Sequence, residues 1–358
     1  MDNIQVKSIE NTSVNHSFPD IFSDFFSTIT SNEIITYLRK KREEQRILKE
    51  ISLSDLFSLH ERYSSLNTIS YQVHISETIE LIEGRIVSSD INQYRGLLLN
   101  IERAMSYFYL FYWIFRFFKY SNATRISLES YSLFRRMFEH LWQIQYPWDL
   151  IRPARISRPL NYTETREIQK IVTYQQKKAW QIAKFIEKKG DVKESLKEVE
   201  ILPHIIKSMG ITGPIARISG NFPLLIPPSS VHTRRSAQLF LKYAYSNDNN
   251  LLSILKISYA ELILALNRIS QLLGEFPIES PEIPKTLVNG EATTSFETVF
   301  GKCHLTINIS DNKIIYYNFI PPQMTNLTGF LEILSTTPVS LKPIFLLLFD
   351  PEISLKVK

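Results

Sequence analysis

Three glycines and a proline fall within the eleven residues 210–220, GITGPIARISG. Glycine and proline interrupt helices and strands, so this segment predicts special backbone between two helical regions. Arg217 lies in its middle, next to apolar side chains. Glycines permit close approach of another backbone and arginine supplies a fixed fork of donors, as a buried polar site requires. The alternative is a plain turn in which Arg217 pairs with a carboxylate.

Composition places the chain among large helical proteins. Its 358 residues are 44% hydrophobic and 22% charged, enough for one large domain or two. Ten glycines are few and 22 phenylalanines are many, which favours an aromatic-rich helical fold. The net charge of +5 is too small to indicate a nucleic-acid partner, whereas an acidic protein or an anionic membrane surface is compatible with it. Cys303 is the only cysteine, which excludes a disulfide framework or a cysteine-ligated metal cluster within this chain.

The N-terminal region is expected to differ from the rest. Residues 1–17 are predicted to be a disordered tail, and the first 20 residues contain no apolar signal-peptide core. Residues 18–69 are predicted to form a helical extension, in which Ser52 or Ser54 caps one helix and the charge run 39–44 lies on a solvated face.

Further along, the apolar pattern predicts a hairpin and then long helices. Residues 70–91 alternate around Tyr71–Ile75 and contain Glu83-Gly84, which is typical of a β-hairpin. Helices are expected at 97–119, 127–145, 163–189 and 248–274, with a proline-containing loop at 147–159. The aromatic stretch 107–118 is short for a membrane span and contains an arginine, so it predicts a buried helix.

The C-terminal third is expected to contain a small sheet. Strands are predicted at 294–298, 304–309 and 313–319, and the apolar segment 341–349 is expected to dock inside the protein. These patterns together predict an α+β, predominantly α fold: a central helical bundle with small antiparallel hairpins near the N-terminal third and the C-terminus. His140 lies on the apolar face of helix 127–145 and is expected to be a core histidine rather than a metal ligand. The sequence contains no Walker loop, GxGxxG, HExxH or GxSxG motif.

The order of several segments resembles the large subunits of energy-converting nickel-iron hydrogenases and their quinone-facing relatives in respiratory complex I. Residues 210–220 are similar to the family's G-x-T-G-P-x-x-R-x-S-G segment, and 91–96 (INQYRG) to its I-G-Y-x-H-R-G motif. LFRRMFEHL at 133–141 resembles the E-x-x-R-I-x-x-H-L helix, with Arg136 and His140 retained. Residues 290–326 and LFDP at 348–351 resemble the closing hairpin and the I-D-P-C-x-x-C end, and the hairpin retains Glu297, Gly301, Pro322 and Asn326. The likeness covers residues 70–358, which we treat as one hydrogenase-large-subunit-like domain.

The departures from this family concern its metal and quinone ligands. Glu352 and Leu355 occupy the positions of the C-terminal cysteine pair, and the segment with the N-terminal pair is shortened. Since soft thiolates hold nickel and iron in the family, the resemblance implies no nickel-iron centre here. The quinone-facing histidine and tyrosine of the complex I relatives also have no direct match; His74 and Tyr94 are the candidate substitutes. Ile254 and Ile257 stand where arginines are expected, while Glu261 is retained.

The resemblance implies a subunit of a membrane-bound oxidoreductase of the respiratory, NADH dehydrogenase-like or hydrogenase-like kind. Such a chain would lie peripherally on the cytoplasmic side, with no cofactor of its own, between an iron-sulfur small subunit and membrane subunits. Arg217, Ser219 and Glu261 would remain as a structural polar group. Two alternatives stay open: a working quinone-reducing subunit, and a stand-alone helical binding protein. The full candidate polar or quinone pocket comprises Arg217, Ser219, His140, Arg136, Glu261, Tyr94 and His74.

Overall fold

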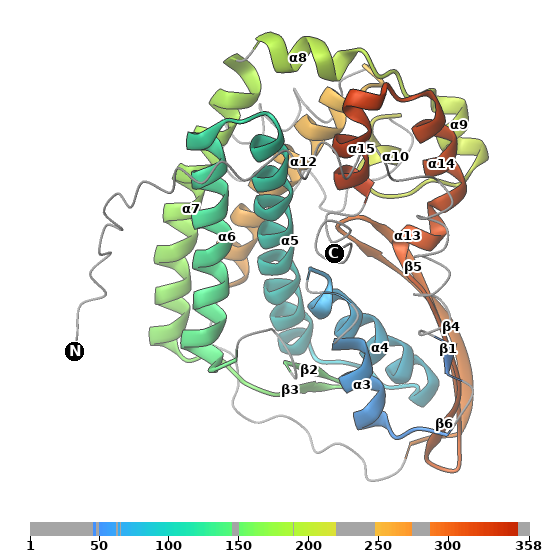
Figure 1. The fold of residues 1–358 in the computed structure, drawn as a ribbon. Coiled ribbons are helices and arrows are strands. Elements are labelled where there is room, and N and C mark those ends of the chain that lie inside the picture. The colour runs from blue at the N-terminus through green and yellow to red at the C-terminus, as the bar shows by residue number, and fades with distance from the viewer. Residues whose placement is uncertain are drawn as a thin grey trace.

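The computed structural model describes residues 46–47, 50–61, 64, 66–144, 150–188, 190–219, 248–273 and 287–349. Within these residues a bundle of four long helices stands beside a curved antiparallel sheet (Figure 1). The bundle consists of α5 (Ser89–Phe117), α6 (Ser121–Trp142), α7 (Tyr162–Lys188) and α12 (Leu251–Leu272). Helix α5 packs against α6 and α12, and α7 packs against the same two helices. The four helices expected from the sequence are thus confirmed, and so is the predominantly helical α+β class.

Helix starts follow ordinary capping chemistry. The side chain of Ser88 accepts a hydrogen bond from the backbone N–H of Ile91 (3.4 Å) at the start of α5, and Asn250 accepts one from Ser253 (3.0 Å) at the start of α12. The aromatic stretch 107–118 lies in the last turns of α5, where most of its side chains are buried in the core of the chain itself. The prediction of a buried helix for this stretch is therefore confirmed for most of its side chains.

The predicted hairpin at 70–91 is wrong, because this segment forms helix α4 (Thr68–Glu83) and the start of α5. Helix α4 is buried on two sides: Ile69 and Val73 face the bundle core, whereas Tyr71 and Ile75 face the core under the sheet. Two apolar faces on one helix imitate the alternation of a strand. Gly84, read as a hairpin turn, is the left-handed C-cap of α4, with φ +63°.

The sheet follows the C-terminal predictions closely. Strands β4 (Gly290–Thr298), β5 (Gly301–Ser310) and β6 (Lys313–Ile320) pair in antiparallel fashion, and the strand order is β1-β6-β5-β4. Asp311 and Asn312 connect β5 to β6 with positive φ values of 49° and 63°, as a tight hairpin turn requires. One face of the sheet packs on α4, and the other carries cross-strand polar pairs such as Glu297 opposite Lys302.

Two short strand pairs lie outside the predicted sheet. Strand β1 (Arg46–Ile47) pairs with β6, although we expected residues 18–69 to be helical. Strands β2 (Ile151–Arg152) and β3 (Arg155–Ile156) form a small hairpin within the predicted loop 147–159. Helix α3 (Leu53–Glu61) confirms the expected helix there, because Ser52 accepts a hydrogen bond from the backbone N–H of Asp55 (3.1 Å). Helix α4 runs across the domain boundary that we drew between residues 69 and 70.

Short helices cover the upper end of the bundle in the view of Figure 1. Residues 190–217 contribute three of them: α8 (Gly190–Lys197), α9 (Pro203–Ser208) and, within the glycine segment, α10 (Pro214–Arg217). The C-terminal segment contributes α13 (Pro322–Thr325), α14 (Leu327–Thr336), a 3-10 turn (Val339–Leu341) and α15 (Lys342–Phe349). Residues 343–349 are all buried, so the predicted docking of this apolar segment is confirmed as far as Phe349.

Some expectations concern residues beyond the described ones. They are the tail 1–17, residues 18–45 with their charge run, the loop at 221–228, and Glu352 and Leu355. Over the described ranges, every helix is too short or too polar to cross a lipid bilayer.

Candidate functional site

The glycine segment meets the turn between β4 and β5 backbone to backbone. Gly213 has φ +80°, and a Cβ atom there would lie 2.7 Å from the carbonyl oxygen of Phe300. Gly301 has φ +135°, and a Cβ atom there would lie 2.6 Å from Thr212 Oγ1. Only glycine fits at such contacts, so the close backbone approach predicted from the sequence is present.

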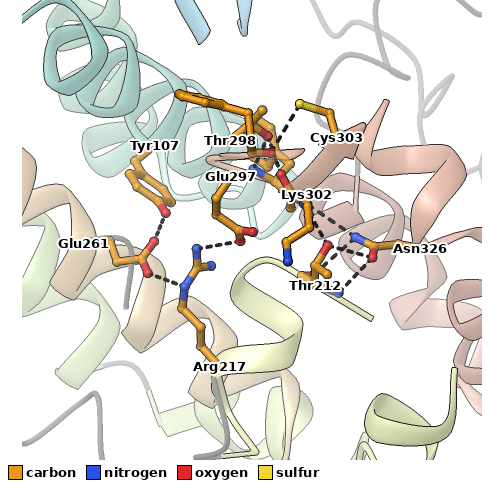
Figure 2. A network of polar contacts seen from close by, with 12 residues as sticks. Tyr107, Thr212, Arg217, Glu261, Glu297, Thr298, Lys302, Cys303 and Asn326 are labelled. Atoms are coloured by element: carbon orange, nitrogen blue, oxygen red, sulfur yellow. Dashed lines mark hydrogen bonds and ion pairs between the residues drawn. The ribbon is translucent and has the colours of Figure 1, made fainter. Parts of the chain in front are cut away.

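Thr212 and Asn326 hold this junction together (Figure 2). The backbone N–H of Thr212 donates to Asn326 Oδ1 at 2.8 Å, and Asn326 Nδ2 donates back to the Thr212 carbonyl at 3.3 Å. The backbone N–H of Lys302 donates to Thr212 Oγ1 at 2.8 Å. Three distant segments, the glycine segment, strand β5 and the start of α14, are therefore fixed to one another.

Arg217 is the last residue of α10 and lies in a buried ionic cluster. Its Nε lies 2.9 Å from Glu261 Oε1 on α12, and its Nη2 lies 3.3 Å from Glu297 Oε1 on β4. Tyr107 on α5 donates a hydrogen bond to the other oxygen of Glu261 (Figure 2). Only 2% of the Arg217 and Glu261 side chains is exposed, whereas a third of Glu297 reaches solvent. The cluster therefore runs from the bundle interior to the surface beside the sheet.

Burial shapes the protonation of this cluster. It raises the pKa of Tyr107 well above its ordinary value, and the neighbouring Glu261 adds to this effect, so the phenol is a donor and not a phenolate. Burial also raises the pKa of Glu297, while Arg217 and Lys302 oppose that shift. Arg103, one helical turn before Tyr107 on α5, has a pKa lowered by burial.

Arg217 and Glu261 are the two predicted pocket residues that the structure brings together. Ser219 lies two residues away but donates its hydroxyl hydrogen to the carbonyl of Ala216 at 2.7 Å, so its predicted part in the pair is wrong. Arg136 and His140 are exposed on α6. The imidazole of His140 is 63% exposed and lies 3.4 Å from Glu167, so it is not a core histidine.

The misplacement of His140 has a simple cause. The buried face of α6 is formed by Phe134, Met137, Phe138 and Trp142. Leu133, Leu141 and Ile144 are only half-buried at the edge of this face. Counting them into the apolar face of helix 127–145 places His140 in the expected core, although it lies outside the buried face.

Tyr94 and His74, the candidate quinone-facing residues, already have internal partners. Tyr94 donates to the Arg158 carbonyl at 2.6 Å and accepts from Trp142 Nε1 at 3.2 Å. The ring nitrogens of His74 lie 2.9 Å from Thr294 Oγ1 and 3.3 Å from Cys303 Sγ. Both side chains thus join elements of the fold to one another: Tyr94 fixes the segment around Arg158, and His74 fixes α4 to the sheet.

Sequence reasoning missed three members of the cluster as site residues: Tyr107, Arg103 and Lys302. Tyr107 and Arg103 are spaced four residues apart on α5, and this polar pair within an aromatic helix was the available signal. Glu297 appeared only as a match to the family's closing hairpin, because the strand pattern does not show what its side chain contacts.

The side chains present do not fit a nickel-iron centre. Such a centre uses four thiolates, and the only cysteine, Cys303, is buried in β5 with its sulfur against His74 and the carbonyl of Phe296. Burial raises the pKa of this thiol far above its ordinary value. Over the described ranges, no three His, Cys, Asp or Glu side chains group as metal ligands would.

Comparison with known proteins gives one informative result. No family model matches the sequence, and no curated protein matches it. Among solved structures, the chain is similar to a subunit of the membrane-bound sulfane sulfur reductase (MBS), an archaeal respiratory membrane complex. The TM-score is 0.66 at 17% sequence identity, over 82% of each chain. The described chain therefore has the fold of a subunit of an archaeal respiratory membrane complex.

Proposed function

We propose that this chain is a large-subunit-like component of a membrane-bound oxidoreductase complex that serves as a scaffold and holds no nickel-iron centre of its own. In this proposal it packs peripherally, on the cytoplasmic side, between an iron-sulfur small subunit and membrane subunits. The redox groups would lie in those partners, and quinone reduction by this chain remains a prediction. The observation that carries the proposal is the fold likeness to a subunit of a respiratory membrane complex over 82% of both chains.

The internal architecture of the site supports this choice. The segments that resemble the hydrogenase-like family converge in space: Thr212 and Gly213 meet Gly301 and Asn326, while Arg217 meets Glu297. A chance likeness of isolated motifs gives no reason for these residues to touch. This convergence supports the proposal that the chain keeps the skeleton of a redox subunit around side chains that bind one another.

The stand-alone binding protein is less well supported. That hypothesis would gain support if segments 74–96 and 294–320, which carry part of the family resemblance, lay apart. Instead, α4 packs directly on β4 and β5, and His74 and Thr78 both reach Thr294, at 2.9 Å and 2.6 Å. The helix and the sheet therefore form one unit beside the bundle.

The test is purification of the tagged chain from membranes in mild detergent, with an untagged strain as the control. We expect co-purification of an iron-sulfur protein and of membrane-spanning proteins, iron in the complex, and no stoichiometric nickel by elemental analysis. Recovery of the chain alone from the soluble fraction would overturn the partnership. Stoichiometric nickel retained by the isolated chain would instead overturn the metal-free part of the proposal.

A further inference from the structure

One nitrogen of the buried Arg217 guanidinium has no partner among the described residues. Nε lies 2.9 Å from Glu261 Oε1 as an ion pair and Nη2 donates to Glu297 Oε1, but Nη1 makes no hydrogen bond within the described ranges. The side chain is 2% exposed, so water of the bulk phase does not reach it freely. A buried donor left without an acceptor costs about 1–3 kcal/mol. Arg217 therefore presents a free donor beside a carboxylate that is partly open to solvent.

A second cation stands on the other side of that carboxylate. Lys302 on β5 lies directly opposite Glu297 on β4 in the strand register, and its side chain is exposed. Arg217 and Lys302 both lower the pKa of Glu297, which places both cations close to it. In the view of Figure 2 the Glu297 carboxylate lies between the guanidinium and the ammonium group. Within the described ranges, no acidic side chain forms an ion pair with Lys302.

The charges of the cluster do not cancel. Arg103, Arg217 and Lys302 carry three positive charges, whereas Glu261 and Glu297 carry two negative ones. Tyr107 stays neutral because its pKa is raised, and Glu102 next to Arg103 is mainly protonated at neutral pH because burial raises its pKa to about 8. Among the described residues the cluster therefore has one more cation than carboxylate, and its exposed cation is Lys302. A buried or half-buried charge in excess is stabilised by a counter-ion.

We infer that Arg217 Nη1 and Lys302 Nζ form a binding site for a small monovalent oxyanion of the carboxylate or nitrate type. The planar guanidinium offers paired N–H donors to such an anion, and the lysine adds a point charge at the solvent side. Glu297 occupies the space between the two cations and competes with the ligand for both. Binding therefore displaces Glu297 from Arg217 or is weakened by it. This inference rests on the local geometry and not on the proposed oxidoreductase role.

Sodium formate and sodium nitrate are suitable probes, titrated into the purified full chain by calorimetry at constant ionic strength. We expect saturable binding of one anion per chain. Lys302→Met removes the exposed cation without disturbing the core and is expected to weaken binding about tenfold. Lys170→Met, an exposed lysine on α7 far along the sequence, is the matched control and is expected to change nothing. Glu297→Gln removes the competing charge and is expected to tighten binding about tenfold.

Each result decides the inference. Binding heats that do not saturate, or equal losses of anion affinity in Lys302→Met and Lys170→Met, would indicate general screening by salt and overturn the proposed site. Weaker binding in Glu297→Gln would also overturn it, because the carboxylate would then support the anion and not compete with it. Circular dichroism of each variant verifies that the fold is intact.

Discussion

Arg217 Nε lies 2.9 Å from Glu261 Oε1, and only 2% of either side chain is exposed. This ion pair joins the short helix α10 to the middle of α12, and the phenol of Tyr107 adds α5 to the same carboxylate. The two charges of a buried ion pair compensate each other for their lost hydration, but such a pair does not by itself stabilise a protein strongly. Removing one member and removing both should therefore have different consequences.

The first prediction concerns the two single variants of this pair. Arg217→Met leaves the Glu261 carboxylate buried beside Tyr107 without its cation, and Glu261→Met leaves the guanidinium without its main anion. We expect each change to lower the free energy of unfolding by about 3–5 kcal/mol, the cost typical of an uncompensated buried charge. Urea unfolding monitored by tryptophan fluorescence measures this difference.

The double variant Arg217→Met with Glu261→Met is the control for this argument. Two apolar side chains of similar length fill the site and remove both charges of the pair, so much of the lost stability should return. A double variant as unstable as the sum of the two single ones would contradict our view that the residues act as a pair.

The second prediction concerns the close approach at Gly213. A Cβ atom at this position would lie 2.7 Å from the Phe300 carbonyl oxygen, and the backbone has φ +80°. Gly213→Ala must therefore push the β4–β5 turn away from α10 as well as strain its own backbone. Gly84→Ala is the matched control, since Gly84 has φ +63° and nothing within 4 Å of its Cβ position. We expect about 1 kcal/mol of destabilisation at Gly84, from backbone strain alone, and a clearly larger loss at Gly213. If thermal unfolding shows equal losses of stability in Gly213→Ala and Gly84→Ala, the β4–β5 turn at Phe300 moves away at no cost in free energy.

The glycine segment shows what a sequence can and cannot provide. The glycines before Arg217 indicated a close backbone approach beside a buried cation, and the approach is present at Gly213. Glu261 entered as a retained residue of the resembling family, and it is the partner of Arg217. The second carboxylate, Glu297, lies 80 positions from Arg217, and no local pattern brings a strand end to a helix end. Such contacts depend on tertiary packing, and residues so far apart in one sequence leave no local pattern that predicts them.

The long helices were predictable because their apolar stripes are continuous, and the C-terminal strands because turn residues separate them. The hairpin prediction for the segment of helix α4 failed for a definite reason: this helix packs between the bundle and the sheet and therefore presents apolar residues on two faces. Buried polar residues such as Gln72 are interspersed between them, and Gln72 accepts hydrogen bonds from the backbone N–H groups of Leu150 and Ile151 (3.2 and 3.1 Å). An alternation of apolar and polar residues on a doubly buried helix cannot be distinguished from that of a half-buried strand.

The third prediction concerns stability at acid pH. His74 is buried between α4 and the sheet, and burial lowers its pKa to about 4 from 6.5. The folded state therefore holds it neutral, whereas the unfolded chain takes up a proton below pH 6.5. The stabilising contribution is complete above pH 6.5 and is lost as the pH falls toward 4, by about 3 kcal/mol in total.

The variant His74→Gln keeps a hydrogen-bonding side chain and removes the titration. Unfolding free energies of the wild type and the variant, measured between pH 7 and 4, should converge as the pH falls. The comparison must be a difference between the two proteins, because Glu102 contributes a slope of opposite sign: its pKa is raised to about 8, so its contribution declines as the pH rises from 4.5 to 8. Parallel curves for the two proteins would show that the pKa of His74 is not lowered in the folded state.

The last prediction separates a structural tyrosine from a quinone-facing one. Tyr94 OH donates to the Arg158 carbonyl at 2.6 Å, and Trp142 Nε1 lies 3.4 Å from the same oxygen. In Tyr94→Phe the indole retains this acceptor, so we expect a loss of only about 1 kcal/mol in the free energy of unfolding. Quinone-linked electron transfer by the purified complex should stay within about twofold of the wild type, whereas removing a donor that acts on the quinone would cost about 100-fold. A 100-fold loss in a complex of normal composition and stability would assign Tyr94 to a quinone site and replace the scaffold role with a catalytic one.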